Sequence, residues 1–228
     1  MALDEALLEQ APTITLRLYG WAPPAVSLGY FQDFATIGPR LPPGMTVVRR
    51  ITGGGAIWHE HEVTYALAGM LGRDGLPQRT RDLYPLLHGA IRTELARRGA
   101  PLLAQPETVG DRRYAAEPRC FASPAADDLV HADGGKALGS AARARGTRVL
   151  VHGSLKLASN PWDGPAVAAC GLDAVAASEA LIVGIATALG LAVEPGELTT
   201  AEEQARQRIQ RERYGDDGWV VERRGPRA

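Results

Sequence analysis

Lysine is scarce in this sequence. Only Lys136 and Lys156 stand among the 25 lysine and arginine residues of the 228-residue chain. A codon bias toward arginine is the simplest explanation. An ammonium differs chemically from a guanidinium, however, so a retained lysine is a candidate for a specific role. Lys156 ends a predicted strand, where the pattern indicates a solvated surface residue.

Net charge, long apolar runs and paired cysteines are also missing. The formal net charge is −1, which gives the whole chain no attraction for nucleic acid or for an anionic membrane surface. No apolar run approaches the roughly 18–20 residues of a membrane span. Acidic residues occupy the N-terminus, where a secretory signal needs basic ones. Because two cysteines make no disulfide framework either, these features favour a cytoplasmic protein.

The order of predicted elements indicates an α/β (α+β) protein. Helical periodicity predicts helices at residues 1–10, 80–99, 177–189 and 199–213. Apolar alternation predicts strands near residues 13–18, 25–29, 47–51, 63–68, 128–132, 136–142 and 147–157. Since hairpin-spaced strands dominate the middle, we expect a mixed, largely antiparallel sheet flanked by helices.

No repeat or low-complexity linker divides the chain. We therefore expect a single domain over residues 1–228, with a core at about 13–192 and a C-terminal helical segment at about 197–228. The chain begins directly at its first predicted helix, so the sequence leaves open whether an upstream strand belongs to the protein.

Three consecutive glycines, Gly53, Gly54 and Gly55, follow a predicted strand. Their backbone entropy is costly, so they need a reason. One reason is a tight turn; the other is a bare main chain whose N–H groups can bond a carboxylate, carbonyl or phosphate. The stretch matches neither the phosphate-binding loop nor the dinucleotide-binding pattern. Arg50, just upstream, would supply positive charge.

Histidines raise the question of a metal site. His59 and His61 would share one face of a strand, but no third ligand follows at a standard spacing, so we expect no metal. His152 lies on the polar face of a predicted strand and is either a core or a site histidine.

The two cysteines differ in their surroundings. Cys170 lies in an alanine-rich stretch before a helix, which is typical of a packed core residue. Cys120 lies in a predicted loop, and a cysteine acts as a nucleophile in its thiolate form, which a nearby ammonium favours. Lys136 begins a strand sixteen positions later, so a loop folding back would join them; spacing alone leaves this contact open.

Several separated stretches together resemble the lipoate-attachment branch of the biotin/lipoate protein ligase superfamily. They are Trp-Ala-Pro-Pro at 21–24, Arg-Arg-Ile-Thr-Gly-Gly-Gly-Ala at 49–56, Lys-Ala-Leu-Gly-Ser-Ala at 136–141, His-Gly-Ser-Leu at 152–155 and Tyr-Gly-Asp-Asp-Gly-Trp at 214–219. The Cys-Phe stretch at 120–129 is most similar to LipM-type octanoyltransferases. The resemblance implies the catalytic-domain fold of that superfamily.

The same resemblance implies an activity. Cys120 would take an octanoyl group from octanoyl acyl carrier protein as a thioester. It would then pass the group to a lysine of a lipoyl-type domain, such as glycine cleavage H protein or a 2-oxoacid dehydrogenase E2, in lipoate biosynthesis. Lys136 would favour the Cys120 thiolate and help polarise the thioester carbonyl. No cofactor would be required.

Further residues are implied to bind substrate. They are Arg50, Gly53, Gly54, Gly55, His59, Ser140, Ala141, His152 and Gly153. Two enzymatic alternatives remain: an ATP-dependent lipoate–protein ligase, which would need Mg²⁺ and ATP but no cysteine, and an octanoyl amidotransferase between carrier domains. A non-catalytic homologue that binds an acyl carrier is a third, against which the ordered presence of Cys120 and Lys136 argues.

Overall fold

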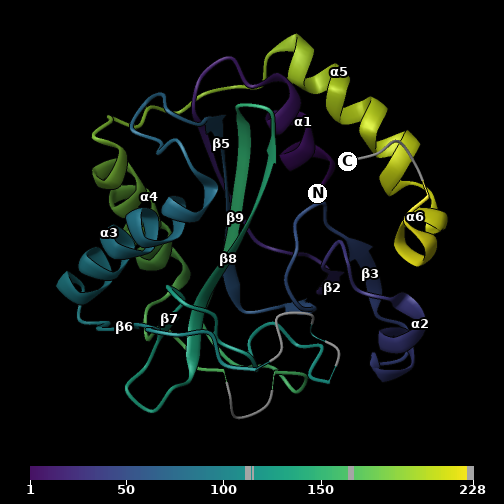
Figure 1. Cartoon of the computed structure of the whole chain (residues 1–228), viewed down its shortest axis with the longest axis horizontal. Coiled ribbons are helices and arrows are strands. Elements are labelled where there is room, and N and C mark those ends of the chain that lie inside the picture. Colours follow the sequence, from purple (N-terminus) through teal and green to yellow (C-terminus); the bar gives the residue numbers. More distant parts are fainter. Residues whose placement is uncertain (111–113, 115, 164–166, 225–228) are drawn as a thin grey trace.

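The protein is described from a computed structural model, which covers residues 1–110, 114, 116–163 and 167–224 (Figure 1). Its α-helices are α1 (Ala2–Gln10), α2 (Phe34–Ile37), α3 (Leu83–Arg97), α4 (Ala174–Leu189), α5 (Thr200–Ile209) and α6 (Asp217–Glu222). Its strands are β1 (Thr15–Tyr19), β2 (Ala25–Leu28), β3 (Thr46–Arg49), β4 (Ile57–His59), β5 (Glu62–Met70), β6 (Leu103–Ala104), β7 (Leu129–Val130), β8 (Lys136–Arg145) and β9 (Arg148–Lys156). The 3-10 helices are η1 (Gly38–Arg40) and η2 (Thr80–Asp82), and a short π-helix, η4 (Gln210–Tyr214), follows α5. Residues 225–228 of the predicted C-terminal segment lie outside the described part of the chain.

The strands form two sheets. Six antiparallel strands are ordered β1-β5-β9-β8-β7-β6. Three more are ordered β3-β2-β4, in which β2 is parallel to β3 and antiparallel to β4. Most strand pairs are antiparallel, one pair is parallel, and helices flank the sheets. The predicted α/β (α+β) class with a mixed, largely antiparallel sheet is therefore confirmed. Sequence reasoning did not foresee the division into two sheets.

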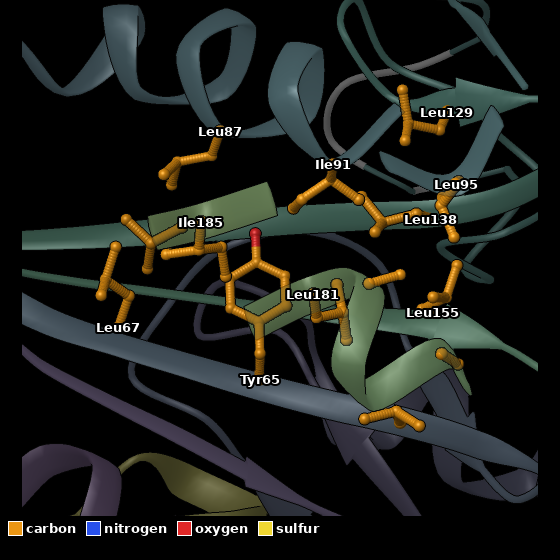
Figure 2. Packing of buried hydrophobic residues seen from close by; sticks show 14 of the residues in the cluster. Tyr65, Leu67, Leu87, Ile91, Leu95, Leu129, Leu138, Leu155, Leu181 and Ile185 are labelled. Atoms are coloured by element: carbon orange, nitrogen blue, oxygen red, sulfur yellow. The ribbon is translucent and has the colours of Figure 1, made fainter. Parts of the chain in front are cut away.

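Helices α3 and α4 cover one face of the larger sheet (Figure 1). Leu83, Leu87, Ile91 and Leu95 recur every fourth residue in α3, which places them on one buried stripe. This side of the core includes Tyr65, Leu67, Leu87, Ile91, Leu138, Leu155, Leu181 and Ile185 (Figure 2). Within the described ranges, no helix is both long and apolar enough to cross a lipid bilayer.

Helices α1, α5 and α6 lie on the other side of the long strands (Figure 1). Leu7 and Leu8 of α1 pack with Leu150 of β9 and Trp219 of α6. α5 begins at the predicted capping box, in which Thr199 and Glu202 satisfy each other's backbone N–H groups. The sequence predicted helical structure over about 197–228 but not a second helix separate from α5, because the six residues of α6 are too few to show a helical period.

The interpretation of Lys156 as a solvated surface residue is wrong. Its side chain is fully buried, and its Nζ lies 3.1 Å from Glu62 and 3.2 Å from Asp163. The Nζ also donates a hydrogen bond of 2.7 Å to the carbonyl oxygen of Trp58 in β4. Strand β4 of the smaller sheet therefore covers the end of β9 that carries Lys156, which the pattern of a single strand indicates as exposed.

Close contact between α3 and α4 depends on a glycine. A Cβ at Gly184 of α4 would lie 2.8 Å from the Cα of Ile91, closer than two such atoms pack. A Cβ at Gly89 of α3, in contrast, would meet no neighbouring element within 4 Å.

These two glycines make a matched test of the interface. Gly89→Ala should raise the free energy of unfolding by about 1 kcal/mol, through better helix propensity. Gly184→Ala gains the same propensity but forces the helices apart, and should lower it by about 1–2 kcal/mol net. Thermal or urea unfolding measures both. Stabilisation by Gly184→Ala equal to that by Gly89→Ala would show that the helices are not in backbone contact there.

Candidate active site

A short backbone bridge holds the Cys120 loop beside the glycine loop. The Ala56 N–H donates to the carbonyl oxygen of Pro118 at 2.7 Å, and the Cys120 N–H donates to the carbonyl oxygen of Ala56 at 2.9 Å. A Cβ at Gly55 would lie 2.7 Å from both Cys120 N and Pro118 O. The third glycine is thus the point at which the cysteine segment packs onto the loop.

The fold brings Cys120 and Lys136 together. The Lys136 Nζ at the start of β8 lies 3.6 Å from the Cys120 Sγ and donates to the Cys120 carbonyl oxygen at 3.3 Å. Both side chains are buried, since Lys136 is 2% exposed and Cys120 is 9% exposed. The contact that sequence spacing left open is therefore present.

Asp128 completes this pair, and sequence reasoning did not single it out. Its carboxylate lies 2.7 Å from the Lys136 Nζ and also accepts from the N–H of Ala125 at 2.6 Å. Burial disfavours a charged lysine, but the Asp128 carboxylate and the Cys120 sulfur outweigh burial, so the pKa of Lys136 is raised. Lys136 therefore stays an ammonium.

A cavity opens beside Cys120. Its wall includes nine of the predicted residues: Arg50, Gly54, His59, Cys120, Lys136, Ser140, Ala141, His152 and Gly153. Gly53 instead lines an adjoining open groove, and Gly55 lies under the cysteine loop. Eleven candidates scattered over one hundred residues of sequence thus converge on one place.

Arg50 holds the glycine loop in shape. Its guanidinium donates to the carbonyl oxygens of Gly53 at 2.8 Å and Gly55 at 2.7 Å, and to Ser27 of β2 through both its carbonyl and its hydroxyl oxygen at 3.0 Å. The side chain is buried, which lowers the pKa of Arg50. The hydrogen bonds of the Arg50 guanidinium therefore position the backbone of the cavity wall.

The Lipoyl protein ligase A/B catalytic domain family matches residues 1–168 of this chain. The chain belongs to this family. It is also 34% identical to Octanoyltransferase LipM of Kyrpidia tusciae, over 96% of this chain and 92% of that protein.

Solved structures agree on the fold of this lipoyl ligase domain. Lipoate-protein ligase A bound with ATP is 20% identical, with a TM-score of 0.76 and coverage of 96% of this chain and 92% of that one. A bipartite lipoate protein ligase from Thermoplasma acidophilum, studied with its E2 lipoyl domain, is 20% identical, with a TM-score of 0.72 and coverage of 96% and 89%. At this identity the likeness concerns the fold alone, and it confirms the predicted catalytic-domain type.

His59 sits between a carboxylate and a hydroxyl in this lipoyl ligase domain. Its Nδ1 lies 2.7 Å from Glu62, its Nε2 lies 2.7 Å from the Ser27 hydroxyl, and Trp21 stacks on its ring at 4.0 Å. His61 does not share that face, because it follows β4 with a positive φ of 52°. Among the described residues, no three His, Cys, Asp or Glu side chains are grouped to hold a metal ion.

Glu62 is the centre of a buried polar network below the cavity. Its carboxylate accepts from Thr64 at 2.6 Å and Ser154 at 2.7 Å, and pairs with His59 and Lys156. Burial by itself raises the pKa of Glu62, but the charges of His59 and Lys156 and the hydrogen bonds of His59 and Thr64 outweigh it and hold the pKa well below its usual range. Glu62 is thus ionised in the folded protein.

His152 links the site to α1 and to the glycine loop. Its Nε2 is hydrogen-bonded to the hydroxyl of Thr52, and its Nδ1 lies 3.9 Å from Asp4. Burial lowers the pKa of His152, although Asp4 opposes the shift. Asp4 was not a candidate in the sequence, because acidic residues in a first helical turn are ordinary.

His88 of α3 is a further residue that the sequence did not reveal. Its Nε2 lies 2.7 Å from the hydroxyl of Ser140, which lines the cavity. The one available signal was a histidine next to Leu87 on the buried stripe of the helix. A polar side chain there needs a partner, but periodicity does not say which.

Glu62→Gln tests the network through its dependence on pH. The depressed pKa means that ionised Glu62 stabilises the fold above the ordinary carboxyl pKa of about 4.3, and that this contribution is lost as pH falls below it. Near neutral pH the variant should therefore lose about 3 kcal/mol relative to the parent protein, and the deficit should shrink as the solution becomes acidic. Chemical denaturation over a pH series measures the difference.

Glu222→Gln is the control. Glu222 pairs with Arg224 at 2.8 Å on the surface, so its substitution should change stability by less than about 1 kcal/mol. A deficit of Glu62→Gln that stays constant from neutral to acid pH would contradict the electrostatic origin of the effect.

Proposed function

We propose that this domain is a protein octanoyltransferase that moves an octanoyl group from acyl carrier protein to a lysine of a lipoyl-type domain, through a thioester on Cys120. The observation that carries the proposal is the contact of 3.6 Å between Lys136 Nζ and Cys120 Sγ, inside the cavity of a domain similar to LipM. A ligase that activates a free fatty acid or lipoate with ATP would not require the Cys120 sulfur.

In the first half-reaction the Cys120 thiolate attacks the carbonyl carbon of the donor thioester. The new carbon–sulfur bond forms as the old one breaks, and the electron pair leaves on the carrier thiol, which takes a proton from water. Lys136 stays charged beside the sulfur, so it offsets the negative charge that develops on the carbonyl oxygen. Asp128 holds the ammonium in place at 2.7 Å.

In the second half-reaction the acceptor lysine attacks the Cys120 thioester. An amide bond forms, and the thiolate returns to its position beside Lys136. Because the thioester already carries the acyl group in activated form, we propose that no cofactor takes part. The cavity residues from Arg50 to Gly153 would enclose the acyl chain, with the glycine loop as one wall.

The partners follow from the same chemistry. The LipM likeness and the lipoyl domain studied with the archaeal ligase support a lipoyl-type acceptor. Acyl carrier protein as donor, glycine cleavage H protein or E2 as acceptor, and a cytoplasmic location complete the proposal. Both cysteines are free thiols, in keeping with a reducing compartment.

Intact mass after incubation with octanoyl acyl carrier protein, in the absence of ATP, tests this function. The parent protein should gain about 126 Da, the mass of an octanoyl group replacing a proton, and hydroxylamine should remove it. Cys120→Ala should gain nothing. Cys170→Ala is the matched control, since Cys170 is packed in the core behind the sheet, and it should be acylated like the parent.

Acceptor modification that requires ATP and proceeds without any adduct on Cys120 would contradict the proposal, in favour of a ligase. Equal labelling of the Cys120→Ala variant would contradict the role of this cysteine.

A further inference from the structure

Ser140 of β8 stands where two spaces meet. It lines the cavity that holds Cys120, and it also lines the adjoining open groove, together with Gly54, Tyr114, Ala125 and Ala141. Gly139, its neighbour, is so close to the ammonium that a Cβ there would lie 2.6 Å from the Lys136 Nζ. A side chain that reaches Cys120 through the groove would therefore pass the Ser140 hydroxyl.

The hydrogen bonds of His88 fix the direction in which the Ser140 hydroxyl points. His88 Nδ1 lies 2.7 Å from the carbonyl oxygen of Asp127, which can only accept, so Nδ1 carries the proton. Nε2 is then an acceptor, and it accepts a hydrogen bond of 2.7 Å from the Ser140 hydroxyl. The Tyr65 hydroxyl, 2.6 Å from Ser140 Oγ, donates to that oxygen.

These bonds connect three elements of the fold. Figure 2 shows the Tyr65 hydroxyl pointing from β5 toward α3, the helix that carries His88. Ser140 donates to His88 and accepts from Tyr65, which leaves one lone pair of its oxygen for a substrate N–H. The arrangement is that of a hydroxyl backed by an oriented base.

The acceptor amine must lose a proton when it becomes an amide, and Lys136 is badly placed to take it. The Asp128 ion pair keeps Lys136 protonated. His59 and His152 line the cavity around Cys120 but not the groove, and their Nε2 atoms are hydrogen-bonded to Ser27 and Thr52.

We infer that Ser140 and His88 form the proton relay for the transfer of the acyl group to the acceptor lysine. This inference rests on the proposed function. The amine nitrogen bonds to the thioester carbon, and the bond from that carbon to Cys120 Sγ breaks with its electron pair going to sulfur. One proton of the nitrogen passes to Ser140 Oγ while the serine proton passes to His88 Nε2. The imidazolium then returns its proton through Ser140 to water in the groove.

The surroundings of His88 suit this role. The charged and titratable groups that face it are Asp127 and Asp128 from the loop before β7, Lys136 of β8, Tyr65 of β5 and Tyr84 of α3. Burial lowers the pKa of His88, although the two aspartates oppose the shift. The imidazole is thus neutral, and able to accept a proton, at physiological pH.

His88→Gln is the decisive variant, because a glutamine amide can donate to Asp127 and accept from Ser140 but cannot take up a proton. Acylation of Cys120 by octanoyl acyl carrier protein and single-turnover transfer from the isolated acyl-enzyme to a lipoyl domain are measured separately. We expect acylation at the parent rate and transfer slowed by about 100-fold or more. Ser140→Ala should slow the transfer step by a similar factor. His131→Gln, a histidine bonded to the Ala169 carbonyl outside the site, should leave both steps unchanged.

The pH profile of the transfer step distinguishes a relay from mere packing. Below the pKa of His88, the parent rate should fall with the square of the proton concentration, since both the amine and the imidazole must be neutral. In His88→Gln it should fall only in simple proportion.

Three results would overturn the inference. One is transfer by His88→Gln within about threefold of the parent rate, and another is equal slowing of both half-reactions. The third is loss of the second-order dependence of the transfer rate on proton concentration in His59→Gln instead of His88→Gln. Failure of the parent protein to form any acyl-enzyme is a different outcome. It removes the proposed function, and the inference falls with it.

Discussion

One buried ammonium constrains the whole site. Lys136 Nζ lies 2.7 Å from the Asp128 carboxylate and 3.6 Å from Cys120 Sγ, with almost no exposure to water. Losing one partner of a buried ion pair costs about 3–5 kcal/mol, so the loop that carries Asp128 and the strand that begins at Lys136 are bound to each other. Gly139 leaves the room that the ammonium occupies. The same charge that organises this corner of the fold is the one proposed to steady a thiolate and a carbonyl oxygen.

The second lysine, Lys156, lies near the same cysteine loop. Lys156 is paired with Glu62 and Asp163, and both lysine ammonium groups lie 5.1 Å from the centre of the Phe121 ring, next to Cys120 in sequence. A cation over an aromatic face is favourable, and more so away from water. The cysteine loop is therefore held against the larger sheet by charges on β8 and β9. Both lysines of the chain are thus buried ammonium groups.

The sequence predicted the local elements well and their partners poorly. The alternation of apolar residues located β5 and β9, and the four-residue spacing from Leu83 to Leu95 located α3. Both patterns depend only on residues that are close in the sequence. The resemblance of the motifs identified the site residues, and nine of the eleven predicted residues line the cavity around Cys120. Asp128, Glu62 and His88 escaped notice, since their importance comes from contacts across the fold. Lys156 was misjudged for the same reason: one strand does not reveal that a second sheet covers it.

Because the chain has only two lysines, nitrogen-15 labelling of lysine gives an NMR measurement in which each side chain has its own signal. If Asp128 keeps Lys136 charged beside Cys120, the Lys136 ammonium should keep its protons well above the ordinary lysine pKa of about 10.4, and Asp128→Asn should abolish the elevation. Titration of Lys136 at or below the ordinary value in the parent protein would contradict this role of Asp128.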